Sequence, residues 1–345
     1  MNTCKVRVAS DKDKGFLLDK FDHFVAVDWS QKTMAIAHLN WRGTTPSVME
    51  NVADVTTLRD YLRSLRGKIC LTFEETTTAH WLYLQLRDCV DRLIICDPFR
   101  NRMLSDGPKT DKIDAAKLCL LLRSGLLKEV FHSADHLFDL RCLVSGYNDV
   151  VKAGVRLLNQ RSAILRARTS DRDEARFVLE QLESDIVAYR QKKALYEAKF
   201  KHLCQHDRQL KRLTRVEGIG PIGAVKILAT VVDAHRFSRT GKYWAYCGLV
   251  TNAKYSGGRC YGRREAHYNR MLKSVYKIAT LAALQGHNPV REYYDSLIAR
   301  GMAPHNARHQ IARYLARVTY GMLKTNTPYD PYCWRTKNAT RHQVA

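Results

Sequence analysis

The run Phe24-Val25-Ala26-Val27-Asp28 decides the fold that this sequence predicts. A second run, Cys70-Leu71-Thr72-Phe73-Glu74, has the same pattern. Each is a short apolar stretch that ends in a carboxylate. Short apolar runs of this composition are typical of buried β-strands. We therefore expect Asp28 and Glu74 at the ends of two strands of a buried sheet.

The sequence around these runs alternates between strand and helix patterns. Strands are expected at residues 24–28, 33–39, 47–52, 70–74 and 93–96, and helices at 57–65, 81–90 and 111–123. Ser124-Gly125 is a typical end for the last helix. Three strands in a meander, followed by strands that alternate with helices, predict a mixed α/β domain over residues 23–134. Its element order is that of the ribonuclease-H superfamily.

The rest of the chain has a different pattern. Residues 135–212 nearly lack glycine and proline and carry apolar residues at close to heptad spacing in two blocks. This predicts two long helices, which form either an antiparallel hairpin within one chain or a coiled-coil dimerisation arm. Residues 213–327 are predicted to be a mostly helical domain with a helix-hairpin-helix. Residues 1–22 are predicted to be a flexible segment, and residues 328–345 a polar tail.

Charge is distributed unevenly along the 345 residues, whose net charge is +23. Residues 28–114 hold 12 basic and 12 acidic side chains, whereas residues 201–276 hold 15 basic and 4 acidic ones. The first stretch can hold a metal ion, and the second is suited to binding phosphate. The alternative for the second stretch is a solvated basic face without a ligand.

Several classes of protein do not fit the composition. None of the 10 cysteines forms a Cys-x-x-Cys pair, which argues against a zinc knuckle or a redox motif. Residues 1–20 do not resemble a signal peptide, and no apolar run approaches the ~18 residues of a membrane span. We expect a cytoplasmic, nucleoid-associated protein with reduced thiols.

Four acids form the candidate catalytic centre: Asp28, Glu74, Asp111 and Asp114. Asp111 and Asp114 are three residues apart on a predicted helix, so their side chains share one face. Carboxylates gathered in this way can hold one or two Mg²⁺ ions for phosphodiester chemistry. Glu75 and Asp97 are the reserve ligands. Any one of these acids alone could be a solvated carboxylate or a helix cap.

Ser256 is the second chemical candidate, in the turn Tyr255-Ser256-Gly257-Gly258-Arg259. Small residues let a nucleic-acid backbone approach a hydroxyl closely, although a plain turn uses the same residues. Gly-Ile-Gly at 218–220 predicts main-chain contacts to phosphate at the start of a helix. The expected nucleic-acid-binding residues are Gly218, Gly220, Lys226, Lys254, Gly257, Gly258, Arg259, Arg263 and Arg264.

Two further groups have weaker signals. His202, Cys204 and His206 could suggest a zinc site, but exposed helix histidines are the preferred interpretation because no second ligand pair is near. The later basic residues, among them Arg308, Arg313 and Arg317, could read base edges, with non-specific phosphate contacts as the default.

Five motifs carry a resemblance to a known family. In chain order they are Val27-Asp28-Trp29-Ser30-Gln31-Lys32, Phe73-Glu74-Glu75-Thr76-Thr77, Lys109-Thr110-Asp111-Lys112-Ile113-Asp114-Ala115-Ala116-Lys117-Leu118, Gly218-Ile219-Gly220-Pro221 and Leu249-Val250-Thr251-Asn252-Ala253-Lys254-Tyr255-Ser256-Gly257-Gly258-Arg259. Together they resemble the insertion-sequence transposases of the IS110 type, the DEDD recombinases that include the Piv-like DNA invertases. The resemblance covers roughly residues 23–325.

The resemblance implies a RuvC-like domain, a coiled-coil arm and a C-terminal transposase domain. It implies Asp28, Glu74, Asp111 and Asp114 as Mg²⁺ ligands and Ser256 as the nucleophile that becomes linked to DNA. It further implies donor and target DNA, a structured bridge RNA, and homodimers that assemble into tetramers. One departure is Glu74-Glu75-Thr76-Thr77, where relatives commonly have Glu-x-Thr-Gly; this alters a turn and leaves the carboxylate.

The sequence therefore predicts a DNA transposase that uses a Mg²⁺-dependent DEDD site and forms a phosphoserine intermediate. The first alternative is a Mg²⁺-dependent, structure-selective nuclease of the Holliday-junction-resolvase type, in which water attacks. The second is a catalytically silent scaffold that binds nucleic acid.

Overall fold

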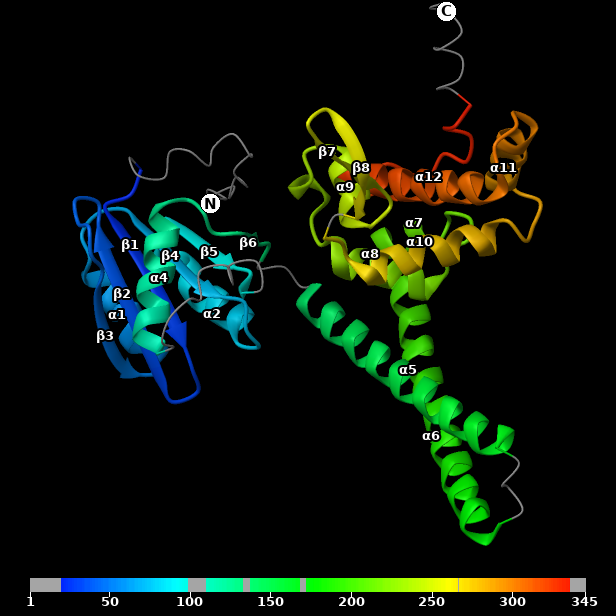
Figure 1. The fold of residues 1–345 in the computed structure, drawn as a ribbon, viewed down its shortest axis with the longest axis horizontal. Coiled ribbons are helices and arrows are strands. Elements are labelled where there is room, and N and C mark those ends of the chain that lie inside the picture. The colour runs from blue at the N-terminus through cyan, green and yellow to red at the C-terminus, as the bar shows by residue number, and fades with distance from the viewer. Residues whose placement is uncertain (1–19, 99–109, 133–136, 168–171, 266, 336–345) are drawn as a thin grey trace, which may run out of the picture. The chain divides into compact units, whose positions relative to one another are not determined.

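The computed structural model describes residues 20–98, 110–132, 137–167, 172–265 and 267–335, and it divides into two compact units, residues 1–134 and 135–345 (Figure 1). The predicted flexible segment therefore lies almost wholly outside the described residues. Its last residue, Asp22, is held in place, because its carboxylate accepts the Lys68 N–H at 2.7 Å.

The first unit is built on one mixed sheet. Its strands are β1 His23–Trp29, β2 Thr33–Asn40, β3 Ser47–Val52, β4 Ile69–Glu74, β5 Arg92–Cys96 and β6 Glu129–Val130, in the order β3-β2-β1-β4-β5-β6. β1, β4 and β5 are parallel, whereas β2, β3 and β6 join antiparallel. The five expected strands are confirmed to within a residue or so at each end. The two-residue β6 was not predicted.

Helices cover both faces of this sheet. α4 (Asp111–Arg123) packs on one face, with a core that includes Phe24, Ala26 and Leu118. α1 (Val55–Ser64), α2 (Ala79–Leu86) and the short 3₁₀ turn η2 (Arg87–Cys89) belong to the other face, with Val25, Val27 and Leu82 in its core. The alternation of strand side chains thus buries two separate cores. The predicted α/β class is confirmed.

The second unit begins with two long antiparallel helices, α5 (Leu137–Arg166) and α6 (Asp173–His206). Arg161 pairs with Glu183 across them. Gly154 makes room for an aromatic ring, because a Cβ on it would lie 2.2 Å from the Tyr189 ring. The two predicted helices are confirmed, and they pair within one chain. A role in dimerisation stays a prediction.

The remaining helices, together with parts of α5 and α6, enclose the largest core among the described residues. They are α7 Arg208–Leu213, α8 Pro221–Val231, the 3₁₀ turn η4 Ala234–Arg236, α9 Thr240–Tyr246, α10 Arg270–Ala283, α11 Pro289–Ala299 and α12 Pro304–Thr325. At its centre the hydroxyls of Tyr243 and Tyr276 lie 2.6 Å apart, and that of Tyr276 lies 2.8 Å from Thr319. α11 was not predicted. A hairpin of β7 (Thr251–Ser256) and β8 (Arg259–Glu265) stands where only a turn was expected.

The first part of the predicted polar tail is not free. Tyr329 donates to the Glu217 carboxylate, and the Trp334 ring stacks on Tyr293 with centroids 5.1 Å apart. These contacts hold Tyr329 and Trp334 against the helical unit, and residues 336–345 lie outside the described residues. Within the described part of the chain, no helix has the length and apolar character needed to cross a membrane.

Candidate functional site

Asp28 continues a row of buried side chains on the α4 face of the sheet. Phe24 and Ala26 belong to the core beneath α4, and strand alternation puts Asp28 on the same side. Its position at the end of β1 leaves it only partly buried. The strand therefore brings a carboxylate to the edge of the hydrophobic core beneath α4.

Glu74 is brought to the same edge by the neighbouring strand. β1 and β4 are parallel, with Val27 opposite Phe73, so Asp28 and Glu74 come next at the carboxyl ends of adjacent strands. Cys70 belongs to the α4-side core, and alternation therefore puts Glu74 on that side as well. The side chain of Glu75 is engaged elsewhere, since its carboxylate lies 2.5 Å from Nε2 of His132.

The first turn of α4 supplies the other two acids. Thr110 caps this helix by accepting the Ile113 N–H at 3.3 Å, and Asp111 and Asp114 follow in the first turn. Acidic residues are favoured there by the helix dipole. Burial, and then the carboxylates of Asp111 and Asp114, raise the pKa of Asp28. The structure thus brings three of the four predicted acids within electrostatic reach of one another.

The donor set fits a hard divalent cation. The four acids offer only carboxylate oxygens, the ligands that Mg²⁺ prefers. Burial first, and then repulsion from Asp111 and Asp114, raise the pKa of Asp28, and a bound cation would offset both effects by stabilising the ionised carboxylate. Among the described residues, no three His, Cys, Asp or Glu side chains are already gathered closely enough to hold a metal ion. Metal binding by Asp28, Glu74, Asp111 and Asp114 therefore stays a prediction, as does the reserve role of Asp97 at the end of β5.

Ser256 ends β7 at the tip of the β7–β8 hairpin, directly opposite Arg259. The two residues between them, Gly257 and Gly258, have φ of +55° and +77°. Two consecutive positive φ values are those of a type I′ turn, which fits the twist of a two-residue hairpin and favours glycine. Ser256 is exposed. The turn thus presents its hydroxyl at the surface.

The root of this hairpin is fixed by contacts that the sequence did not reveal. Nε of Arg313, on α12, donates to the Leu249 carbonyl at 2.7 Å, just before β7. The carbonyl of Arg313 in turn accepts Trp244 Nε1–H at 2.9 Å. Beyond β8, the Asn269 N–H donates to the Tyr246 carbonyl at 2.8 Å. Arg313, one of the later basic residues that could contact nucleic acid, thus also anchors the serine hairpin.

The predicted nucleic-acid contacts fall into two groups. Lys254, Arg259 and Arg263 are exposed on the hairpin, as are Gly257 and Gly258, whereas the side chain of Arg264 lies outside the described residues. The others belong to the helix-hairpin-helix. Gly220 has open space around it, but a Cβ on Gly218 would lie 2.0 Å from the Ala279 carbonyl oxygen, so Gly218 serves packing on α10. Lys226 is half-buried over the Tyr147 ring, and burial lowers the pKa of its amine.

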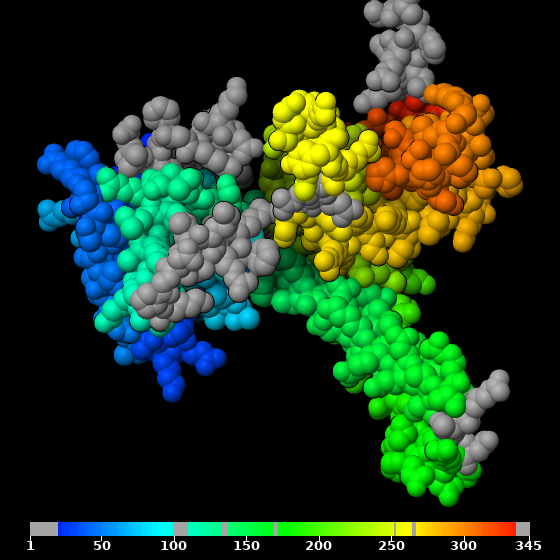
Figure 2. Space-filling view, viewed as in Figure 1, coloured from blue at the N-terminus to red at the C-terminus, as the bar shows by residue number. Residues whose placement is uncertain are grey.

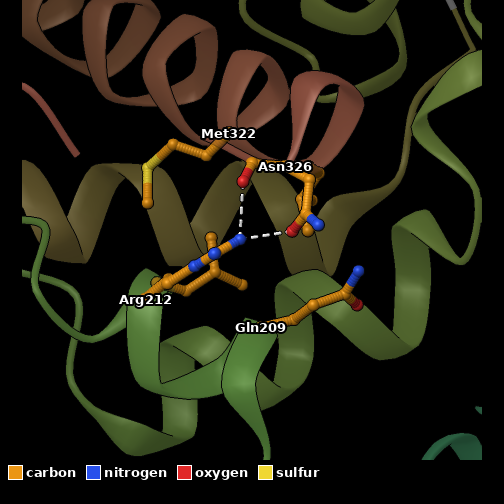
Figure 3. Close-up of a pocket in the computed structure, with 6 residues that line it drawn as sticks. Gln209, Arg212, Met322 and Asn326 are labelled. Atoms are coloured by element: carbon orange, nitrogen blue, oxygen red, sulfur yellow. Dashed lines mark hydrogen bonds between the residues drawn. The ribbon is translucent and has the colours of Figure 1, made fainter. Parts of the chain in front are cut away.

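Two other features have structural explanations. His202 and His206 stack with ring centroids 4.1 Å apart on α6, in agreement with the preferred interpretation as helix histidines. Figure 3 shows a small pocket between α7 and the end of α12, where Arg212 donates to the Asn326 carbonyl at 2.6 Å and to its side-chain oxygen. The hydrogen bonds of Arg212 hold α7 against the end of α12. None of the predicted site residues lines this pocket.

Comparison with protein families gives two matches. Residues 25–168 match a transposase model for DEDD proteins of the IS110 type, and residues 210–295 match the Transposase IS116/IS110/IS902 family. The first match includes all four acids and the second includes Ser256.

Three individual proteins that resemble this chain are also named as transposases or as insertion-element proteins. The chain is 29% identical over 154 residues to the insertion element IS110 uncharacterized 43.6 kDa protein of Streptomyces coelicolor, over 44% of this chain and 38% of the relative. It is 25% identical over 126 residues to the insertion element IS116 uncharacterized 44.8 kDa protein of Streptomyces clavuligerus, over 36% and 32%. It is 30% identical over 158 residues to a probable family 20 transposase of Pseudomonas aeruginosa, over 45% and 47%. The matched stretches thus span between about a third and a half of these relatives.

Proposed function

Because the chain belongs to the IS110-type transposases, we propose that it cuts and rejoins DNA, with Ser256 as the nucleophile and a divalent cation held by Asp28, Glu74, Asp111 and Asp114. The observation that carries this proposal is the position of the acids: Asp28 and Glu74 follow buried residues at the carboxyl ends of adjacent parallel strands, on the face that α4 covers, and Asp111 and Asp114 lie in the first turn of α4. The likeness to RuvC-like domains belongs to the same proposal, and the mixed sheet with helices on both faces supports it.

Ser256 is exposed at the tip of the hairpin, so its hydroxyl can attack a phosphate only if neighbouring groups hold that phosphate beside it. Lys254 and Arg259 stand next to Ser256 on the hairpin and would hold the phosphate oxygens. Mg²⁺ at the acids would withdraw charge from the phosphate. Ser256 Oγ attacks phosphorus, the P–O bond to the deoxyribose breaks, and the serine proton ends on the leaving sugar oxygen.

The step exchanges one phosphodiester for another. The phosphoserine bond keeps the energy of the bond that was broken, so a hydroxyl of the partner strand can attack it and restore Ser256. Rejoining then requires no nucleotide hydrolysis.

The partners are part of the proposal. The acids and Ser256 belong to different units of the chain, so a joint site requires the two units to meet, within one subunit or between subunits. We include donor and target DNA, a structured guide RNA of the bridge type, a homodimer that assembles into a tetramer, and association with the nucleoid. The net charge of +23 supports nucleic-acid partners in general.

Covalent trapping tests the proposal. The protein is purified together with the nucleic acid that it retains, and this nucleic acid is sequenced. DNA duplexes of the sequences found are then incubated with the protein and Mg²⁺, and the reaction is stopped with a denaturing detergent. We expect a protein–DNA adduct whose peptide contains Ser256, absent in Ser256→Ala and in EDTA. Free cleaved ends produced equally well by Ser256→Ala would overturn the proposal in favour of a nuclease that uses water.

A further inference from the structure

Two large aromatic side chains stand in the open on the serine hairpin. Tyr255 is 68% exposed and Tyr261 is 65% exposed, on a hairpin whose other described side chains are small or charged. The hairpin lies at the surface of the helical unit, in yellow in Figure 2. A single exposed aromatic residue is normal on a protein surface. A binding role is indicated only where its position and its neighbours also fit a ligand.

Tyr261 occupies an irregular position. Lys254 pairs with Gly262 and Tyr255 pairs with Cys260, so Tyr261 is left without a partner across the ladder. Gly262, which follows it, has φ of +154°. An extra residue of this kind is a β-bulge, and bulges redirect a side chain.

The bulge turns Tyr261 toward the face that holds the serine. Nζ of Lys254 lies 5.9 Å from the centre of the Tyr261 ring, so the two side chains share a face. Ser256 is two residues beyond Lys254 and therefore on the same side, and Arg259 is its cross-strand partner. One face of the hairpin thus combines a hydroxyl, two cations and an exposed ring. Tyr255, by alternation, belongs to the opposite face.

This combination fits one kind of ligand. Cations bind backbone phosphates, and an exposed ring stacks on the face of a base, which is how proteins hold single strands. In a paired duplex the base faces are covered by neighbouring bases, so a base must leave the stack to meet the ring. Lys254 and Ser256 are about 7 Å apart along the strand, which places the ring within one or two nucleotides of the hydroxyl.

We propose that Tyr261 stacks on an unpaired DNA base next to the phosphate that Ser256 attacks, with Lys254 and Arg259 on the flanking phosphates. The inference rests on the proposed function and adds to it a substrate class: DNA that is locally unpaired at the cleavage site. The strand is DNA, since the hairpin carries the residue proposed to join to DNA.

Equilibrium binding without chemistry tests this. The full chain with Ser256→Ala is titrated with a DNA duplex that has three central unpaired positions including 2-aminopurine, with the fully paired duplex, and with an RNA version of the unpaired probe. We expect the unpaired DNA to bind more tightly and its fluorescence to be quenched. Tyr261→Ala should lose about 5- to 150-fold in affinity for the unpaired probe, while changing affinity for the paired duplex less than about twofold. Tyr261→Phe keeps a ring and should behave as the parent.

The opposite face provides the matched control. Tyr255→Ala removes an equally exposed tyrosine from the same hairpin and should bind within about twofold of the parent. Equal losses in Tyr255→Ala and Tyr261→Ala, equal losses on paired and unpaired DNA, or failure of Tyr261→Phe would overturn the inference, and so would preference for the RNA probe. No bond is broken in this assay, so its result does not depend on the nucleophile. If Tyr261 stacks on the unpaired base but the protein with Ser256 intact forms no covalent adduct, the proposed function alone is overturned.

Discussion

The acids of the first unit and the serine of the second stand on supports of opposite kinds. Asp28 follows Val27, which is 1% exposed, in a strand between two buried neighbours. Ser256 stands on a two-stranded hairpin whose described side chains from residue 253 to 263 are all exposed. The acids are thus positioned by a packed core, whereas the serine is positioned by main-chain pairing and by the contacts at the hairpin's root. We therefore expect an acid in the first unit to be replaceable with loss of activity and little change in structure, whereas activity in the second unit should also depend on residues that only hold the hairpin in place.

The largest effect is expected from Asp28→Asn, which keeps the shape and removes the charge. If the acids hold a cation worth several kcal/mol in the transition state, strand cleavage should fall on the order of 10³-fold. Burial, and then Asp111 and Asp114, raise the pKa of Asp28, so its ionised form opposes folding at neutral pH. The variant should accordingly unfold at the same temperature as the parent, or higher, in EDTA.

The measurements are adduct formation and thermal unfolding, each with Mg²⁺ and with EDTA. The parent should be stabilised by Mg²⁺ and the variant should not. A variant that keeps full cleavage, or one that is stabilised by Mg²⁺ as the parent is, would break the contrast between a unit whose carboxylates hold metal and a unit whose serine is the nucleophile.

Sequence reasoning succeeded where packing dictates position. Alternation groups Glu74 with Thr72 and puts Glu75 on the side of Leu71 and Phe73, which favoured Glu74 as the ligand. In the structure Leu71 and Phe73 are indeed buried in the core on the face opposite α4, whereas the ligand role of Glu74 stays a prediction.

It failed where position depends on contacts between distant segments. The hairpin around Ser256 has no buried face, so no hydrophobic periodicity marks its strands, although Gly257-Gly258 is a known hairpin signal. Arg313 resembles any surface arginine until α12 brings it to the Leu249 carbonyl. The docking of Trp334 on Tyr293 is likewise a tertiary contact.

An intermediate effect is expected from Arg313→Lys, which keeps the charge and removes the Nε–H that holds Leu249. Losing one such bond costs about 1–1.5 kcal/mol, so adduct formation should slow about five- to tenfold. Amides of β7 and β8 should exchange hydrogen faster, because the root of the hairpin is loosened. Arg308→Lys, on the exposed side of the same helix, should change neither quantity. A weaker salt dependence of DNA binding in Arg313→Lys, with unchanged hydrogen exchange, would instead assign Arg313 to phosphate.

The smallest effect is expected from Glu75→Gln, and it tests the acidic edge most finely. Glu75 is adjacent in sequence to Glu74, yet its carboxylate lies against Nε2 of His132 at 2.5 Å. The glutamine can keep a hydrogen bond to that ring, so cleavage should stay within about threefold of the parent and stability within about 1 kcal/mol. Glu74→Gln, its matched partner, should lose cleavage as Asp28→Asn does. If the two variants exchange these behaviours, Glu75 is the ligand, and the side chains at the end of β4 turn over when DNA and metal bind.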